Sequence, residues 1–332
     1  MPIIDFHNHV YPPQYIEALR VGPSAYRVTF DSDNNPVLHS PGDYNVAVPG
    51  HRLMDVRQEV LDADGVDMQV ISLTAPGTLL ETPARGVELA RLVNDAFAGI
   101  QRDYPTRFVA LATLPLHDPE ASVAELQRAV GQLGLKGATL FGNINGVALS
   151  DERFWPLYEA ANEMSLTFFI HPTYPVGVEA MLDYMLMPLV GFLADTTLAA
   201  ASLVFSGVAE RFPNIRWVLG HLGGAIPYLA ERLDRGFEAY DVCRRNIDRL
   251  PSEILRENFY YDTVNFDPRC LKLAIDFAGA DHVVAGSDYP HLIGSIPKMI
   301  ASINALDISV DERAAILGGN TTRLLGLSTV AA

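Results

Sequence analysis

The chain has 332 residues, and 49% of them are hydrophobic, which is enough to bury a large core. Its 40 acidic and 24 basic residues give a formal net charge of −16, which argues against nucleic acid and against an anionic membrane surface as partners. A few well-placed arginines can still reverse the charge locally, so a small-molecule carboxylate substrate is not excluded.

Several features of the sequence favour a cytoplasmic protein. The two cysteines, Cys243 and Cys270, lack metal-type spacing and are too few for a disulfide framework. No basic region of a secretory signal precedes the first apolar run. The longest apolar stretch, residues 185–205, is interrupted by Pro188 and Asp195, so we expect a buried helix there and no membrane span.

Short apolar runs alternate with helical patterns along the chain. These runs are apolar on both faces, which is typical of buried strands in a parallel sheet. The predicted strands span residues 3–10, 67–73, 107–115, 136–142, 166–172, 215–224, 259–265 and 282–290. Eight strands that are each followed by a helix predict an α/β fold of the (β/α)8 TIM-like barrel type over residues 1–332. A doubly wound open sheet is the main alternative, but no Gly-x-Gly-x-x-Gly motif follows any strand.

One long irregular segment, residues 11–50, lies between the first strand and the first regular helix. It contains the sequence YRVTFDSDNNPVLHS, which predicts a hairpin with its turn at residues 33–35. Long loops on a barrel commonly cover an active site, so we expect this insertion to form a lid.

Five polar residues stand at or near the ends of predicted strands. His7 and His9 are two residues apart on the first strand, so their side chains point to the same side. His171, His221 and Asp288 end the fifth, sixth and eighth apolar runs. The carboxyl ends of barrel strands open onto one face, and three or four histidines with an aspartate there predict a transition-metal site. Spacing alone does not separate His221 from the ligands.

Longer motifs are informative in combination: DFHNHV, FFIHPTYP, VLGHLGGAIPYLAERL and GSDYP. Together they resemble the amidohydrolase superfamily, and within it the branch of aminocarboxymuconate-semialdehyde decarboxylase and the hydroxybenzoate-type decarboxylases. The resemblance implies one divalent metal ion, zinc before manganese, with a water completing its shell. The ligands that it implies are His7, His9, His171 and Asp288, and His221 would be the acid/base residue. The fourth strand ends in LFGN, without the lysine of binuclear relatives, so one ion is expected.

The resemblance also indicates two arginines that would bind a substrate carboxylate. Arg57 and Arg232 match such positions, and in the related enzyme the second arginine comes from the neighbouring subunit. The planar guanidinium binds a carboxylate through two parallel hydrogen bonds. We therefore expect a homodimer with shared active sites, although both arginines are equally compatible with solvated ion pairs on helices.

Three hypotheses of function follow. The first is metal-dependent, non-oxidative decarboxylation of a small unsaturated or aromatic acid, with His221 moving a proton and Asp288 as a second candidate for delivering it. The second is hydrolysis of an amide or lactone, or hydration of an unsaturated acid, on the same site. The third is a non-enzymatic metal-binding protein, which the presence of all five site residues disfavours.

The remaining histidines have no placement of this kind. We expect surface or loop positions for His39, His51, His117 and His282, and a structural role for His291.

Overall fold

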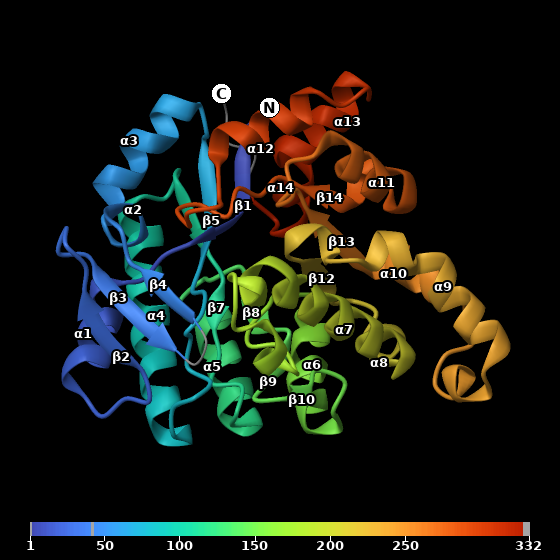
Figure 1. Cartoon of the computed structure of the whole chain (residues 1–332), viewed down its shortest axis with the longest axis horizontal. Helices are drawn as coiled ribbons and strands as arrows, with labels where there is room; N and C mark the ends of the chain where they lie inside the picture. The colour runs from blue at the N-terminus through green and yellow to red at the C-terminus, as the bar shows by residue number, and fades with distance from the viewer. Residues whose placement is uncertain (1, 41–42, 328–332) are drawn as a thin grey trace.

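Eight strand positions form a closed parallel barrel in the computed structural model, which describes residues 2–40 and 43–327 (Figure 1). The third position is divided into two short strands, β6 and β7. In chain order the barrel strands are β1 (Ile4–His9), β5 (Met68–Ser72), β6 (Phe108–Ala110), β7 (Ala112–Thr113), β8 (Gly137–Phe141), β11 (Thr167–His171), β12 (Arg216–Leu219), β13 (Phe259–Asp262) and β14 (Val283–Val284). The α/β barrel predicted from the sequence is confirmed.

The strands pair in two arcs that meet at two places. One arc is β1-β5-β6 and the other is β14-β13-β12-β11-β8-β7, with every neighbouring pair parallel. The barrel closes where β1 meets the segment after β14: Phe6 N donates to Ala285 O at 2.7 Å, and Asp288 N donates to His7 O at 2.8 Å. This closure places the loop that carries Asp288 directly against His7.

A register irregularity in β1 decides which of its side chains face the barrel interior. The pairing with β5 shifts between Asp5 and Asn8, as at a β-bulge. As a result, the consecutive rings of Phe6 and His7 both contact Phe169, with centroids 5.5 and 4.8 Å apart. The histidine cluster therefore packs directly on the apolar side chains that fill the barrel interior.

Helices cover the outside of the barrel, with an extensive apolar layer between helices and strands. The principal helices are α3 (Met54–Asp64), α4 (Pro83–Asp103), α5 (Pro119–Gly131), α6 (Trp155–Glu163), α7 (Phe192–Phe205), α9 (Ile226–Ala239), α10 (Pro251–Asn258), α11 (Pro268–Ala278) and α12 (Ile296–Asn304). Shorter helices are α8 (Val208–Arg211), α13 (Val310–Ala314) and α14 (Asn320–Leu324), and a small hairpin, β9 (Asn143–Ile144) with β10 (Val147–Ala148), follows β8.

Two predicted strands are too long. The strand predicted over 215–224 ends at Leu219, and the one predicted over 282–290 ends at Val284. His221 and Asp288 therefore lie in the connections beyond β12 and β14. Both have positive φ angles, 53° and 58°, which side-chain-bearing residues adopt where the surrounding structure fixes them, often at functional sites.

The segment at residues 11–50 has regular structure. It contains α1 (Pro13–Val21), the antiparallel strands β2 (Arg27–Phe30), β3 (Pro36–Ser40) and β4 (Asp43–Val46), and the start of α2 (Pro49–Arg52). The predicted hairpin is confirmed, since Phe30 pairs with Pro36 and Asn34 has the positive φ of a turn residue. Figure 1 shows β2–β4 beside α1 and α4, at the edge of the barrel. Its role as a lid remains a prediction.

Among the described residues, one helix is long and apolar enough to cross a membrane, Met187–Phe205. Core helices of soluble proteins pass the same test. Here one side of the helix packs on the barrel through Asp195, Ala199 and Leu203, while Leu198 on the other side is exposed. The expected buried helix is thus buried on one side only.

Candidate metal centre

Four of the five strand-end residues converge on one point. One potential ligand atom from each of His7, His9, His171 and Asp288 lies within 4.8 Å of the other three, and all four side chains are buried. His7 and His9 come from β1, His171 ends β11, and Asp288 lies in the loop after β14. These are the four residues that the family resemblance implied as ligands, and the structure brings their side chains together.

The distances within the cluster fit a single metal ion. His7 Nε2 lies 3.1 Å from His9 Nε2 and 3.5 Å from Asp288 Oδ1, and His9 Nε2 lies 3.2 Å from the same carboxylate oxygen. Ligand atoms that are each 2.0–2.1 Å from a common ion lie about 3–3.5 Å from one another. Asp288 Oδ1 is buried without a hydrogen-bond partner, which is costly unless a cation or a donor satisfies it.

Hydrogen bonds at the far side of each ring orient the three imidazoles. His7 Nδ1 bonds to Asp262 Oδ2, and His171 Nδ1 donates to Pro172 O at 2.8 Å. His9 Nδ1 lies 3.2 Å from Ser72 Oγ, whose hydroxyl donates to Asn8 O and so can accept from the imidazole. Each ring consequently leaves Nε2 for a metal, the arrangement by which outer partners fix the tautomer of a ligating histidine.

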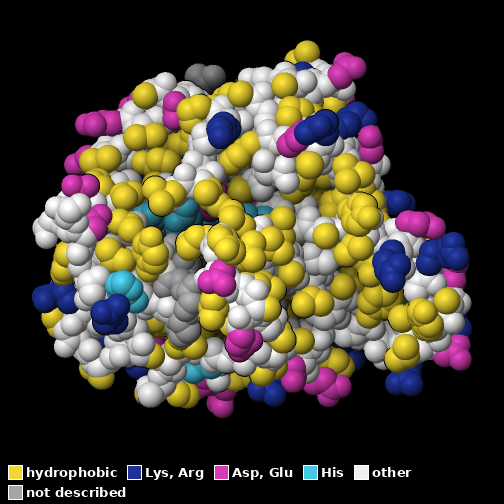
Figure 2. All heavy atoms as spheres, viewed as in Figure 1, with side chains coloured by type: hydrophobic (Ala, Val, Ile, Leu, Met, Phe, Trp, Pro, Cys, Tyr) yellow, Lys and Arg dark blue, Asp and Glu magenta, His cyan; other side chains and the backbone are white. Residues whose placement is uncertain are grey.

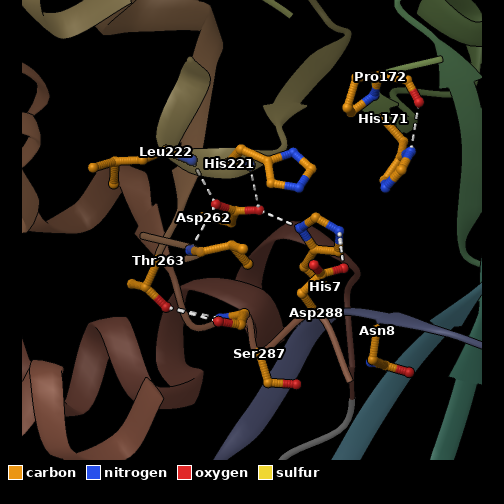
Figure 3. Close-up of polar contacts among 12 residues, drawn as sticks. His7, Asn8, His171, Pro172, His221, Leu222, Asp262, Thr263, Ser287 and Asp288 are labelled. Carbon is orange, nitrogen blue, oxygen red and sulfur yellow. Dashed lines mark hydrogen bonds and ion pairs between the residues drawn. The ribbon is translucent and has the colours of Figure 1, made fainter. Parts of the chain in front are cut away.

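Asp262 is the residue of the site that the sequence did not reveal. It ends β13, and its carboxylate accepts from His221 N at 2.9 Å and from Leu222 N at 2.7 Å. Figure 3 shows Asp262 between the turn that carries His221 and the ring of His7. This carboxylate therefore fixes both the ligand His7 and the backbone at His221. Its only signal in the sequence is a polar residue at the end of FYYD.

His221 lies beside the cluster but is not among the four converging groups. Its ring centroid is 5.1 Å from that of His7 and 5.6 Å from that of His171, and its Nδ1 is buried without a hydrogen-bond partner. Burial, reinforced by the neighbouring His7, lowers the pKa of His221, which favours a neutral imidazole. The geometry thus separates His221 from the four converging groups, which the spacing alone did not do.

Arg57 does not face the cluster. Its guanidinium is completely buried and donates to Gly50 O, Asn8 Oδ1, Gln69 Oε1 and His9 O. Four of its five N–H groups are thus used by the protein, which leaves little capacity for a two-bond grip on a substrate carboxylate. The predicted substrate contact of Arg57 is not supported. The solvated ion pair that was its alternative is also wrong, because tertiary packing buries this helical position.

Arg232 also lies apart from the cluster in a single chain. It is exposed on α9, the helix after the turn that carries His221. Its predicted role depends on a second subunit and remains a prediction.

Two further histidines lie next to the cluster. The ring of His291 is 5.0 Å from that of His9, and the ring of His51 is 5.1 Å from that of His291. The expected surface or loop position of His51 is wrong: its side chain is 1% exposed, because α2 packs against the loop after Asp288. Figure 2 shows histidine side chains in a recess on the face that it displays.

The fold and the cluster together define a (β/α)8 barrel with a buried group of side chains that could hold a metal ion at the carboxyl ends of its strands. The chain belongs to the amidohydrolase family, whose family model, described as Amidohydrolase, matches residues 4–327.

Similar proteins include several decarboxylases. The 2-amino-3-carboxymuconate-6-semialdehyde decarboxylase of Dictyostelium discoideum is 35% identical over 82% of this chain and 76% of its own length. The crystal structure of 5-carboxyvanillate decarboxylase from Sphingomonas paucimobilis matches with a TM-score of 0.87 and 28% identity, covering 98% of this chain and 99% of that one. A dihydroxybenzoic acid decarboxylase from Polaromonas sp. JS666, crystallised with manganese and the inhibitor 2-nitroresorcinol, matches with a TM-score of 0.83 and 26% identity, covering 98% and 97%.

Proposed function

We propose that this protein is a metal-dependent, non-oxidative decarboxylase of a small unsaturated or aromatic carboxylic acid. The observation that carries the proposal is the convergence of three histidines and Asp288, with His221 beside them, in a chain whose similar proteins are named as decarboxylases. The names of those relatives support the substrate class and the reaction, and the convergence of these side chains supports the roles that the family resemblance implies for them.

His7, His9, His171 and Asp288 would hold one divalent ion per chain. Three imidazoles and one carboxylate suit zinc better than manganese, which prefers oxygen ligands. We therefore propose zinc as the resident ion, while the manganese of the Polaromonas neighbour makes that metal the alternative. When bound, the ion supplies positive charge that orients an acid and stabilises negative charge developing on it.

The chain's own residues would move the proton. Loss of carbon dioxide breaks a carbon–carbon bond whose electron pair stays on the substrate carbon, and that carbon must take up a proton. His221 lies beside the cluster with a buried, unpartnered Nδ1, so we assign proton transfer to it. Asp288 has a carboxylate oxygen at the same point and is the second candidate for delivering the proton.

We also propose that the active protein is a homodimer. A group of large apolar side chains is exposed on neighbouring segments from residue 182 to α7 and on α9, and we call it the apolar face. Its members are Leu182, Tyr184, Met185, Leu189, Val190, Leu198 and Tyr228. Figure 2 shows hydrophobic side chains gathered near the middle of the molecule and beside α9. Exposed apolar surface of this kind marks interaction sites.

Arg232 belongs with this apolar face. It follows Tyr228 by four residues on α9, so the two side chains lie on the same side of the helix. In a dimer formed through this face, Arg232 would enter the partner's active site and bind the substrate carboxylate.

For Arg57 we propose a positioning role instead, since it holds the His9 carbonyl and the Asn8 side chain on β1. A cytoplasmic location remains part of the proposal.

The test is a screen of metal-loaded protein against hydroxybenzoic, carboxyvanillic and muconate-type acids, with carbon dioxide release as the readout. We expect release from at least one acid and none from the His221→Ala variant. If the protein instead hydrolyses lactones or amides and releases no carbon dioxide, the decarboxylase assignment is wrong.

A further inference from the structure

The two histidines beside the cluster, His51 and His291, have no part in the proposed proton transfer. The ring of His221 lies next to those of His7 and His171. The ring of His291 lies next to that of His9, with the two centroids 5.0 Å apart. An acid bound at the cluster would therefore be flanked by His221 on one side and by the His291–His51 pair on another.

The ring of His51 is an unusual buried group. Its side chain is 1% exposed, and both Nδ1 and Nε2 are buried without a hydrogen-bond partner. Buried polar atoms are nearly always satisfied, and each unsatisfied one costs stability. The ring packs against Tyr11 on one side, at 5.0 Å between centroids, and against His291 on the other. His291 itself is only partly buried, so a molecule in the recess can reach it.

The fold holds His51 in this place by close packing. Gly50, which precedes it in α2, has no room for a side chain, because a Cβ there would overlap the hydroxyl of Tyr289. Tyr289 directly follows Asp288, so α2 is held against the loop that carries this ligand. Arg57 supports the same contact, since its Nε donates to Gly50 O at 3.0 Å and its guanidinium lies over the ring of Tyr289.

We propose that His51 and His291 form a substrate-binding pair that recognises a hydroxyl group on the acid held at the metal cluster. The proposal rests on the proposed function for the position of the acid. It goes further by assigning a role in substrate recognition to these two residues.

A hydroxyl group fits this pair better than a second carboxylate. Burial, with His291 and Arg57 adding to it, lowers the pKa of His51 well below its usual value, which favours the neutral ring. A neutral imidazole offers one donor and one acceptor. A hydroxyl group can donate to one ring and accept from the other, whereas a carboxylate can only accept and would bring a second negative charge into a buried site.

The test measures binding with compounds that cannot lose carbon dioxide. The parent probe is 2-nitrophenol, and the four compounds that add one hydroxyl to its ring are 3-nitrocatechol, 4-nitroresorcinol, 2-nitrohydroquinone and 2-nitroresorcinol. Dissociation constants are measured by calorimetry on metal-loaded wild type, His51→Leu and His291→Phe, with metal content determined for each. His282→Gln is the matched control, because His282 stacks on Tyr260 away from the cluster.

We expect at least one of the four compounds to bind wild type about tenfold tighter than 2-nitrophenol, the effect of one good hydrogen bond. In His51→Leu and His291→Phe that ratio should fall to about twofold or less, with the metal retained and the 2-nitrophenol affinity little changed. His282→Gln should keep the wild-type ratio. If His51→Leu does not fold, the partly exposed His291→Phe decides alone.

Two results would overturn the pair. One is the absence of any preference for an added hydroxyl in wild type, and the other is a preference that persists in the folded variants. A change only in thermal stability of His51→Leu, with the ratio intact, would mean that water satisfies the ring. Because the probes undergo no reaction, the hydroxyl preference can stand even if no acid is decarboxylated, and decarboxylation can stand without it.

Discussion

The two sides of the barrel mouth differ in how completely this chain supplies their contacts. On the side of β1, β13 and the loop after β14, hydrogen bonds within the chain orient the rings of His7 and His9, as Asp262 does for His7. On the side of α7 and α9, large apolar side chains and Arg232 are exposed. The first side is prepared to hold a metal within one chain, whereas the second has the composition of a surface that another chain covers.

The two sides also differ in their charged residues: those of the first side are buried, whereas Arg232 of the second side is exposed. Among the carboxylates of the first side, Asp5 accepts from Gln69 Nε2 at 2.7 Å and from Ser287 Oγ at 2.6 Å, whereas Asp288 Oδ1 has no hydrogen-bond partner. In a protein of formal net charge −16, Arg57 is a buried cation on this side, and an ion held by the cluster would add further positive charge. The second side offers Arg232, a cation still free to serve a neighbour.

The largest expected effect is loss of the metal. In His171→Ala the cluster loses one of three imidazoles, so we expect metal content to fall far below one ion per chain and activity to disappear. Elemental analysis after gel filtration, with activity measured before and after adding zinc, checks this. His282→Ala is the matched control and should keep one ion. Two ions per wild-type chain, or none after reconstitution, would contradict the single site.

The second effect concerns the residue that stands beside the ligands. His221→Ala should keep one metal ion per chain and lose activity by about 10²- to 10⁴-fold, the usual contribution of a positioned acid/base group. The same elemental analysis and a carbon dioxide assay measure both quantities. Equal metal loss in His221→Ala and His171→Ala would make His221 a ligand and would leave Asp288 as the remaining candidate for delivering the proton.

The sequence predicted the first side better than its surroundings, for physical reasons. A strand has a period of two, so His7 and His9 could be assigned to one face, and strand-end positions in a barrel share one opening. The loop geometry at His221 and Asp288 was not predictable, because positive φ angles at these residues depend on the completed fold. The four residues expected as ligands nonetheless converge, since their placement depends on where the strands end.

Burial by distant packing explains what the sequence missed. Arg57 has the local sequence of a solvated helical residue, but it is buried, and Asn8 and His9 of β1, almost fifty residues earlier, accept from its guanidinium. His51 is buried because α2 packs on the loop that follows Asp288, some 240 residues later in the sequence. Asp262 looks like any polar residue that ends a strand, and only the closed barrel brings its carboxylate to His7.

The third effect tests how the second side is attached to the barrel. Asp195 of α7 accepts from Asn143 Nδ2 at 2.8 Å and from Thr173 N at 2.9 Å, and burial raises its pKa to about 6. Because this carboxyl binds its proton more tightly in the folded than in the unfolded protein, its contribution to stability is complete below about pH 4. That contribution is lost as the pH rises through about 6, where the folded protein must ionise the buried carboxyl. Relative to wild type, Asp195→Asn should therefore gain up to about 3 kcal/mol of unfolding free energy between pH 4 and 7.

Urea unfolding at intervals across this pH range measures that difference. The amide can cause a constant loss of stability, but a constant loss does not change with pH. Glu159→Gln, on the exposed surface of α6, is the control and should follow wild type. Parallel stability curves for Asp195→Asn and wild type would show that Asp195 does not titrate as expected.

The fourth effect weakens the first side without removing a ligand. Asp262→Asn keeps the shape of the side chain but replaces its carboxylate by an amide, which has one acceptor oxygen. The amide cannot accept from His7 Nδ1 and from the backbone N–H groups of residues 221 and 222 as the carboxylate does. We expect metal affinity to fall by about 10- to 100-fold, as is typical for such outer partners. Competition with a chelator of known affinity measures it. An unchanged affinity would mean that the ligands hold their orientation without Asp262.

The smallest effect is the return of activity when two inactive proteins are mixed, and it tests whether the second side needs another chain. His221→Ala lacks the acid/base residue of its own site, and Arg232→Ala lacks the arginine that it would give to its partner. In a mixed dimer one site receives both defects and the other receives none. Random exchange makes half of the dimers mixed, so about a quarter of wild-type activity should return. Leu198→Asp, which places a charge on the apolar face, should abolish both the dimer and the recovery. If subunit exchange is demonstrated by mass spectrometry and no activity returns, Arg232 acts within its own chain or not at all, and the difference between the two sides is not one of shared sites.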